Sequence, residues 1–214
     1  MKQLKEYENL YRLYRESIRP IKTLICICLA VFILGLATMF FYFVPFGLTM
    51  FMLLFIIPAV ILGCVLPIAS IRTKQLFKTC SPSWLAQVDA HVKQAEKCGG
   101  LYVTREALVD TRLGVCVVPM EDLLWVYLDV TEHYYWHFIK IGTTCQLVLA
   151  DKHGKKRYVG LKKGKKTYPL IEAEMRKYHQ NIIFGYEAGL DKIYETNRGR
   201  MIAFAEGTEE YAQR

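Results

Sequence analysis

A long uncharged run, residues 23–71, constrains the fold of this chain more than any other feature of its sequence. A charged group at the centre of a bilayer costs several kcal/mol, and one membrane-spanning helix needs about 20 apolar residues. The run is long enough for two such helices, and Val44-Pro45-Phe46-Gly47 interrupts it near its middle. We therefore predict a transmembrane helical hairpin over residues 23–71, with spans from Leu24 to Phe43 and from Leu48 to Ser70.

The charges that flank this run predict the orientation of the hairpin. Basic residues accumulate in the head, whose last residue is Lys22. They accumulate again directly after the uncharged run, at Arg72, Lys74 and Lys78. The interruption between the spans carries no charge. Because cytoplasmic flanks collect Lys and Arg, we expect a multi-pass protein of the cell membrane with both termini in the cytoplasm. A signal peptide is not expected, because the apolar stretch is too long and a second span follows it.

The remaining polar part of the chain, residues 72–214, is close to the commonest domain size and large enough for one core. The predicted organisation is a cytosolic amphipathic helix over 1–22, the hairpin over 23–71, a connecting helix over 72–100, a cytosolic domain over 101–200 and a polar tail over 201–214.

The head carries an apolar and aromatic stripe at helical spacing. One interpretation is that this stripe packs on the cytosolic domain or lies in the headgroup layer. The other is that it forms a site for a partner helix or for self-association, as the small residues of the spans also would. The residues of the stripe are Leu4, Tyr7, Leu10, Tyr11, Tyr14 and Ile18.

After the second span the periodicity first indicates a helix that begins near Ser81 and ends at Gly99-Gly100. Short strands separated by polar breaks follow, and two helices, over about 168–180 and 187–198, close the domain. The fold class is therefore α+β: a two-span hairpin followed by a small antiparallel β-barrel or sandwich with C-terminal helices. The predicted strands are Leu101–Val103, Ala107–Asp110, Gly114–Val118, Leu123–Val130, Tyr134–Ile141, Thr144–Ala150 and Lys156–Leu161.

This order of elements resembles a bacterial pleckstrin-homology-like membrane protein family. Leu101–Thr104 and Ala107–Asp110 are similar to the opening hairpin of that fold. Gly114–Pro119 followed by Glu121–Tyr127 is similar to its step from a proline through acidic residues into an apolar strand. The resemblance covers about residues 98–180, and many members of that family carry a two-span hairpin before the domain. It implies a binding or scaffolding module rather than a catalyst.

Motifs that would indicate an enzyme or a cofactor are lacking. There is no G-x-S-x-G and no C-x-x-C, and the seven cysteines are expected to be free thiols in a reducing compartment. His133 and His137 lie four apart, but Tyr134 occupies the position of the glutamate that a metalloprotease helix needs. The segment Gly160–Thr167 has one residue too few between its glycines for a phosphate-binding loop. We therefore expect no enzymatic activity, no metal and no cofactor.

The densest polar feature is a basic cluster around two predicted turns, which contain Gly154 and Gly164. Three interpretations are open: a solvated rim without a ligand, contact with membrane lipids through anionic headgroups, and nucleic-acid binding, which the membrane anchor and the lack of a reader motif argue against. We expect binding or scaffolding at the cytosolic membrane face. The alternative is an accessory or regulatory subunit of a membrane protein complex. The residues expected to contact anionic lipid or a partner are Lys152, Lys155, Lys156, Arg157, Lys162, Lys163, Lys165 and Lys166.

Overall fold

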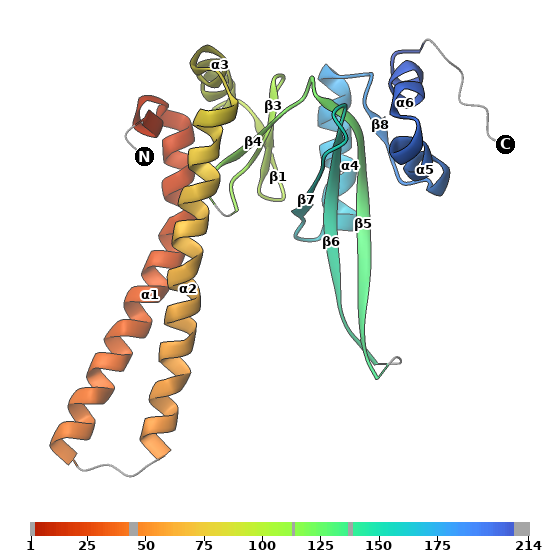
Figure 1. Cartoon of the computed structure of the whole chain (residues 1–214). Helices are drawn as coiled ribbons and strands as arrows, with labels where there is room; N and C mark the ends of the chain where they lie inside the picture. Colours follow the sequence, from red (N-terminus) through yellow and green to blue (C-terminus); the bar gives the residue numbers. More distant parts are fainter. Residues whose placement is uncertain (1–2, 43–46, 113, 137–138, 208–214) are drawn as a thin grey trace. The chain divides into compact units, whose positions relative to one another are not determined.

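The chain forms two compact units, and helices α1 (Glu8–Tyr42) and α2 (Gly47–Thr79) belong to the first (Figure 1). The structure, a computed structural model, describes residues 3–42, 47–112, 114–136 and 139–207, with side chains throughout except at 35–42, 47–57, 59 and 62. Unit 1 consists of Met1–Asp89 and Thr111–Cys116, and unit 2 consists of Ala90–Asp110 and Val117–Arg214.

Unit 1 is helical: a short 3-10 helix η1 (Gln3–Glu6) precedes the long helices α1 (Glu8–Tyr42) and α2 (Gly47–Thr79), which lie side by side, and α3 (Pro82–Val92) follows (Figure 1). Helix α1 runs through Pro20 and so joins the predicted head and first span into one helix.

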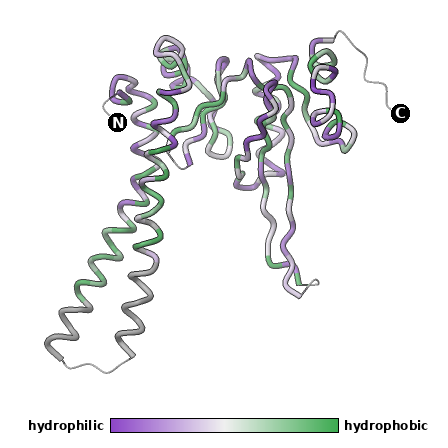
Figure 2. The backbone as a smooth tube through the Cα atoms, in the orientation of Figure 1, coloured by the Kyte–Doolittle hydropathy of each residue, from purple (hydrophilic) through white to green (hydrophobic). Residues whose placement is uncertain are grey.

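Within the described residues, one helical stretch, Glu8–Leu34, is long and apolar enough to cross a membrane. By length and composition it fits a membrane span or a signal sequence. Apolar side chains on this stretch face outward, among them Ile27, Ile33 and Leu34, and its hydropathy rises along the helix (Figure 2). The predicted interruption between the spans lies almost wholly outside the described residues, so the second span stays a prediction.

The aromatic and apolar stripe of the head is covered by the chain's own helices. Leu4, Leu10 and Ile18 are buried. The Tyr7 ring lies 6.0 Å from the Phe77 ring of α2, and its hydroxyl donates to a backbone carbonyl of α3 over 3.4 Å. This intramolecular packing buries most of the stripe against the chain itself.

Asp89 of α3 fastens the start of α1. Its carboxylate accepts the Leu10 backbone N–H at 2.7 Å and the Asn9 side-chain amide at 3.2 Å. The first N–H groups of a helix have no partner inside the helix, and a negative charge is favoured at this end of the helix dipole. Asp89 therefore acts as an N-terminal cap supplied from a distant part of the chain.

Thr73 of α2 holds the second, short segment of unit 1, residues 111–116, in place. Its buried hydroxyl donates to the Ala69 carbonyl at 2.8 Å and accepts the Val115 N–H at 3.1 Å. The segment can approach this closely because residue 114 is a glycine with φ +77°. A Cβ at Gly114 would lie 2.5 Å from the Ala69 carbonyl oxygen.

Unit 2 contains two four-stranded sheets, with strand orders β1-β2-β3-β4 and β7-β6-β5-β8. Among the described residues the two sheets do not close into a barrel. Strand β8 pairs parallel to β5, which the antiparallel prediction did not include. The helices of this unit are α4 (Gly164–Tyr178), α5 (Ala188–Thr196) and α6 (Arg198–Ala205). The strands are β1 (Glu96–Cys98), β2 (Leu101–Val103), β3 (Ala107–Asp110), β4 (Cys116–Pro119), β5 (Leu123–Tyr135), β6 (Ile139–Asp151), β7 (Lys156–Gly160) and β8 (Ile183–Phe184).

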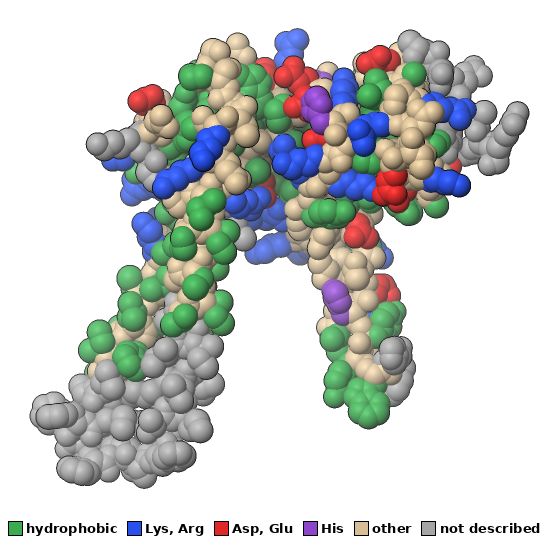
Figure 3. All heavy atoms as spheres, in the orientation of Figure 1, with side chains coloured by type: hydrophobic (Ala, Val, Ile, Leu, Met, Phe, Trp, Pro, Cys, Tyr) green, Lys and Arg blue, Asp and Glu red, His purple; other side chains and the backbone are tan. Residues whose placement is uncertain are grey.

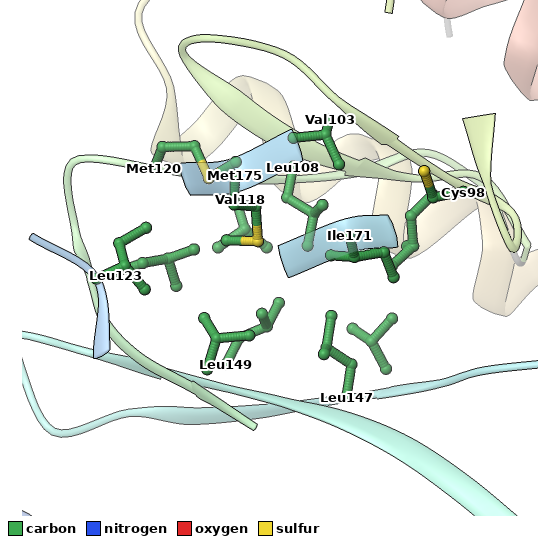
Figure 4. Packing of buried hydrophobic residues seen from close by; sticks show 14 of the residues in the cluster. Cys98, Val103, Leu108, Val118, Met120, Leu123, Leu147, Leu149, Ile171 and Met175 are labelled. Atoms are coloured by element: carbon green, nitrogen blue, oxygen red, sulfur yellow. The ribbon is translucent and has the colours of Figure 1, made fainter. Parts of the chain in front are cut away.

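The main core of unit 2 lies between the two sheets and helix α4 (Figure 4). Leu108 and Val118 come from the first sheet and Leu147 and Leu149 from the second. Ile171 and Met175 of α4 are fully buried among them. The groove between the strands and this helix is therefore filled by the chain itself.

A second cluster covers the opposite face of the β5–β6 pair. Trp125 and Val148 lie on this face and pack against Leu190 and Tyr194 of α5 and Met201 of α6. The Trp125 indole donates to the Gly185 carbonyl at 2.7 Å, so its one polar group is satisfied. Helix α6 extends into the start of the segment that we predicted as a polar tail. Met201 explains this extension, because its side chain is buried.

Two of our boundary predictions are wrong. Gly99-Gly100 does not end the connecting helix, which stops at Val92; the two glycines, with φ of +62° and +95°, form the turn of the β1–β2 hairpin. The strands predicted at 123–130, 134–141 and 144–150 are two long strands, β5 and β6, whose turn follows Tyr135. No glycine, proline, asparagine or aspartate marks that turn in the sequence.

We predict that Gly114→Ala destabilises the full-length protein by about 2–4 kcal/mol, because the change strains a positive φ and drives a methyl group into a backbone carbonyl. The matched control is Gly142→Ala in β6, where a Cβ would meet no atom within 4 Å and the effect should stay within about 1 kcal/mol. Thermal unfolding of both variants in detergent measures the difference. Equal unfolding midpoints for the two variants would contradict this account of the loop.

Candidate functional site

Strand β7 separates the predicted basic residues: two precede it, two lie on it and four follow it. Lys152 and Lys155 belong to the β6–β7 turn, which closes on Asp151: the Asp151 carboxylate accepts the His153 N–H at 2.9 Å and the Lys155 N–H at 2.8 Å. Lys156 and Arg157 lie on β7 itself. The remaining four lysines follow the far end of β7, where helix α4 begins.

Lys156 serves the fold of unit 2 and is not available to a ligand. Its ammonium group lies 2.8 Å from the Asp191 carboxylate and 3.2 Å from that of Glu195, both on α5. It also lies over the Tyr194 ring, 5.3 Å from the centroid. Burial alone would lower the pKa of Lys156, but the hydrogen bonds to Asp191 and Glu195 raise it above the ordinary lysine value. The side chain is only 19% exposed.

Four lysines at the start of α4 form a positive surface that we call the basic turn: Lys162, Lys163, Lys165 and Lys166. All four side chains are exposed, and among the described residues none forms an ion pair with a carboxylate. Like charges so close together repel one another, so the turn attracts anions that would relieve the repulsion.

Local geometry explains why the lysines gather at one place. Lys163 adopts the left-handed conformation, with φ 53° and ψ 43°, and its carbonyl accepts the Lys166 N–H at 2.8 Å and the Thr167 N–H at 3.1 Å. The Thr167 hydroxyl donates to the Lys162 carbonyl at 3.0 Å. Gly164 packs directly on Cys145 of β6, where no larger residue fits. The backbone is thus turned inward and the lysine side chains outward.

The basic turn lies beside the point at which the β5–β6 hairpin leaves the core. The Leu161 N–H donates to the Cys145 carbonyl at 2.7 Å, and a Cβ at Gly164 would lie 3.2 Å from the Leu128 side chain. Farther out, the pKa of Glu132 is lowered chiefly by its hydrogen bond with Lys140, then by one with Tyr134, and in smaller part by the charge of Lys165. The charge of Lys165 therefore reaches one carboxylate on the exposed half of the hairpin.

A surface pocket of about 360 Å³ lies elsewhere on unit 2, near the C-terminal end of α4 and helix α6. Lys152 of the predicted set lines it, together with Glu121, His179 and Glu206. Because these charged side chains have opposite signs, the pocket offers no clear selection for an anion.

The two histidines singled out in the sequence are not brought together by the described structure. His133 hydrogen-bonds to Thr144 over 2.6 Å, and His137 lies outside the described residues. Within those residues there is no group of three or more His, Cys, Asp or Glu side chains that would hold a metal ion. Free cysteines include Cys98, whose thiol pKa is raised by burial.

A family model described as "Domain of unknown function (DUF6709)" matches residues 72–194. The chain belongs to this family. The DUF6709 segment begins directly after the uncharged run and ends in α5, so it includes all eight predicted basic residues and the whole β5–β6 hairpin. No curated protein and no solved structure matches the chain.

We predict that Lys156→Ala is less stable than Lys155→Ala, although each variant replaces one of two adjacent lysines. Lys156→Ala leaves two carboxylates without their partner and removes a contact with Tyr194, which should cost about 1–3 kcal/mol. Lys155 is exposed, and its replacement should change stability by no more than about 0.5 kcal/mol. Thermal unfolding of the two full-length variants tests the assignment, and equal midpoints would show that Lys156 is not structural.

Proposed function

We propose that this chain is a non-enzymatic, membrane-anchored binding or scaffolding protein that acts at the cytosolic face of the cell membrane. In this proposal the uncharged run forms two spans, both termini lie in the cytosol, and unit 2 is a pleckstrin-homology-like domain. Its basic turn binds anionic lipid headgroups.

The observation that carries the proposal is the concentration of four exposed lysines, none of them ion-paired within the described residues, on one turn of a chain that also has a helix suited to a membrane. A lysine close to an anionic membrane surface contributes about 1 kcal/mol, so four together contribute about 4 kcal/mol. That energy corresponds to roughly a thousandfold preference for an anionic surface over a neutral one. The filled groove behind α4 leaves this outer surface as the better candidate for binding.

The alternative function, an accessory subunit of a membrane complex, relied on the aromatic stripe of the head and on the spans. Leu4, Leu10 and Ile18 of that stripe are covered by the chain's own helices. No contact among the described residues favours this alternative.

Hydrogen exchange of the full-length protein in nanodiscs tests the proposal. The first N–H groups of a helix have no partner inside it, so the amides at the start of α4 are sensitive reporters of a bound headgroup. We predict that the amides of residues 162–165 exchange more slowly in nanodiscs that contain phosphatidylglycerol than in nanodiscs of phosphatidylcholine alone. Equal exchange in the two lipids would contradict headgroup binding.

Charge reversal provides the matched comparison. Lys162→Glu, Lys163→Glu, Lys165→Glu and Lys166→Glu combined should abolish the protection that depends on anionic lipid. Lys152→Glu with Lys155→Glu, at the opposite end of β7, should preserve it. If both variants lose protection to the same degree, the effect is general electrostatics and the basic turn is not a specific site.

A further inference from the structure

The outer half of the β5–β6 hairpin projects from unit 2 without covering on either face. Residues 123–127 of β5 and 147–151 of β6 are buried, whereas residues 131–135 and 139–141 are exposed. The two strands remain paired out to Tyr135 and Ile139, with an irregularity between His133 and Tyr134. A two-stranded ribbon alone is only marginally stable in water. We therefore expect another surface to cover this extension.

The end of this hairpin is apolar and aromatic, and space-filling shows hydrophobic side chains gathered there (Figure 3). We define the hairpin tip as Tyr134, Tyr135, Trp136, Ile139 and Ile141; His137 and Phe138 lie outside the described residues and are not part of it. Trp136 is 67% exposed and Ile141 is 66% exposed. The Tyr135 and Trp136 rings lie 6.2 Å apart, so they form one apolar surface.

Polar groups accompany these rings. Glu132 accepts a hydrogen bond from the Tyr134 hydroxyl at 2.6 Å and pairs with Lys140, and both ionic side chains remain partly exposed. A dry protein interface is depleted of charge at its centre. The membrane–water interface instead favours tyrosine and tryptophan, whose rings enter the apolar layer while their polar atoms stay hydrated.

We propose that the hairpin tip inserts into the interfacial layer of the membrane, as a second contact beside the basic turn. This inference rests on the proposed function, which places unit 2 at the membrane surface. The charges support this: the tip itself carries no charged side chain, the Glu132–Lys140 pair next to it is balanced, and the basic turn adds four positive charges where the hairpin leaves the core. An anionic bilayer matches both parts of this surface.

The length of the hairpin sets how the two contacts are made. A strand rises about 3.3 Å per residue, so the tip stands roughly 20 Å beyond the basic turn. One headgroup layer is only about 5–8 Å thick. The hairpin therefore lies oblique to the membrane plane when tip and turn both touch it.

Fluorescence of Trp136 in the full-length protein tests this insertion. The protein is reconstituted into liposomes with or without brominated phosphatidylcholine, whose bromine atoms quench tryptophan inside the bilayer. Trp136→Phe is measured in parallel, and subtraction removes the emission of Trp84 and Trp125. We predict that brominated lipid removes most of the Trp136 emission and that aqueous acrylamide quenches it weakly.

Two variants made in the Trp136→Phe background provide matched controls. Ile139→Trp returns a tryptophan to the tip and should be quenched by brominated lipid. Tyr158→Trp places one at an exposed position of β7 and should be quenched by acrylamide instead. If brominated lipid and acrylamide quench the tryptophans at positions 139 and 158 to the same degree, the tip has no special contact with lipid.

The remaining outcomes separate this inference from the function on which it rests. If the protein enters the liposomes but acrylamide quenches Trp136 and brominated lipid does not, the tip does not insert, and the membrane anchor is unaffected. If neither agent quenches Trp136, a second copy of the chain covers the tip, which also overturns the inference. If the protein does not enter the bilayer at all, the proposed function fails first.

Discussion

Burial of both faces of the β5–β6 pair is the constraint on which unit 2 depends. One face packs against the first sheet and α4, through residues such as Val126 and Leu149, and the other packs against α5 and α6, through Trp125 and Val148. Because a strand directs successive side chains to opposite faces, only an unbroken apolar run satisfies both clusters at once. The run in β5 ends at Leu128, and there the hairpin leaves the core beside the basic turn.

That constraint explains which parts of the fold were predictable. The apolar segment after Glu121 and Asp122 indicated a strand correctly, since few other structures bury such a run. The tight turn at 151–154 was also predictable, because Asp151 and Gly154 are typical turn residues. The turn after Tyr135 was not, because an aromatic residue in a left-handed conformation leaves no compositional signal. Glycine pairs are ambiguous in another way: they end helices and form hairpin turns equally well, and Gly99-Gly100 does the latter.

The candidate site shows the same limit. The sequence grouped eight basic residues, but strand β7 separates the two turns that contain six of them. Only the folded chain shows that Lys156 pairs with carboxylates of α5. Its neighbour Lys155 is exposed, although the two residues look alike in the sequence. Lys156 pairs with Asp191 and Glu195, which lie on a helix more than thirty positions away in the sequence. No local sequence pattern therefore predicts the pairing.

Backbone conformation links the basic turn to the hairpin tip. Among the described residues, Lys163 and Trp136 are the two non-glycine residues with positive φ, each at 53°. A left-handed residue other than glycine costs about 1–2 kcal/mol, so glycine would be favoured at both positions if stability alone decided. Both side chains are exposed, so burial in the core does not offset that cost. If an anionic bilayer binds the lysine at one position and the indole at the other, as we propose, these contacts offset the cost of both left-handed residues.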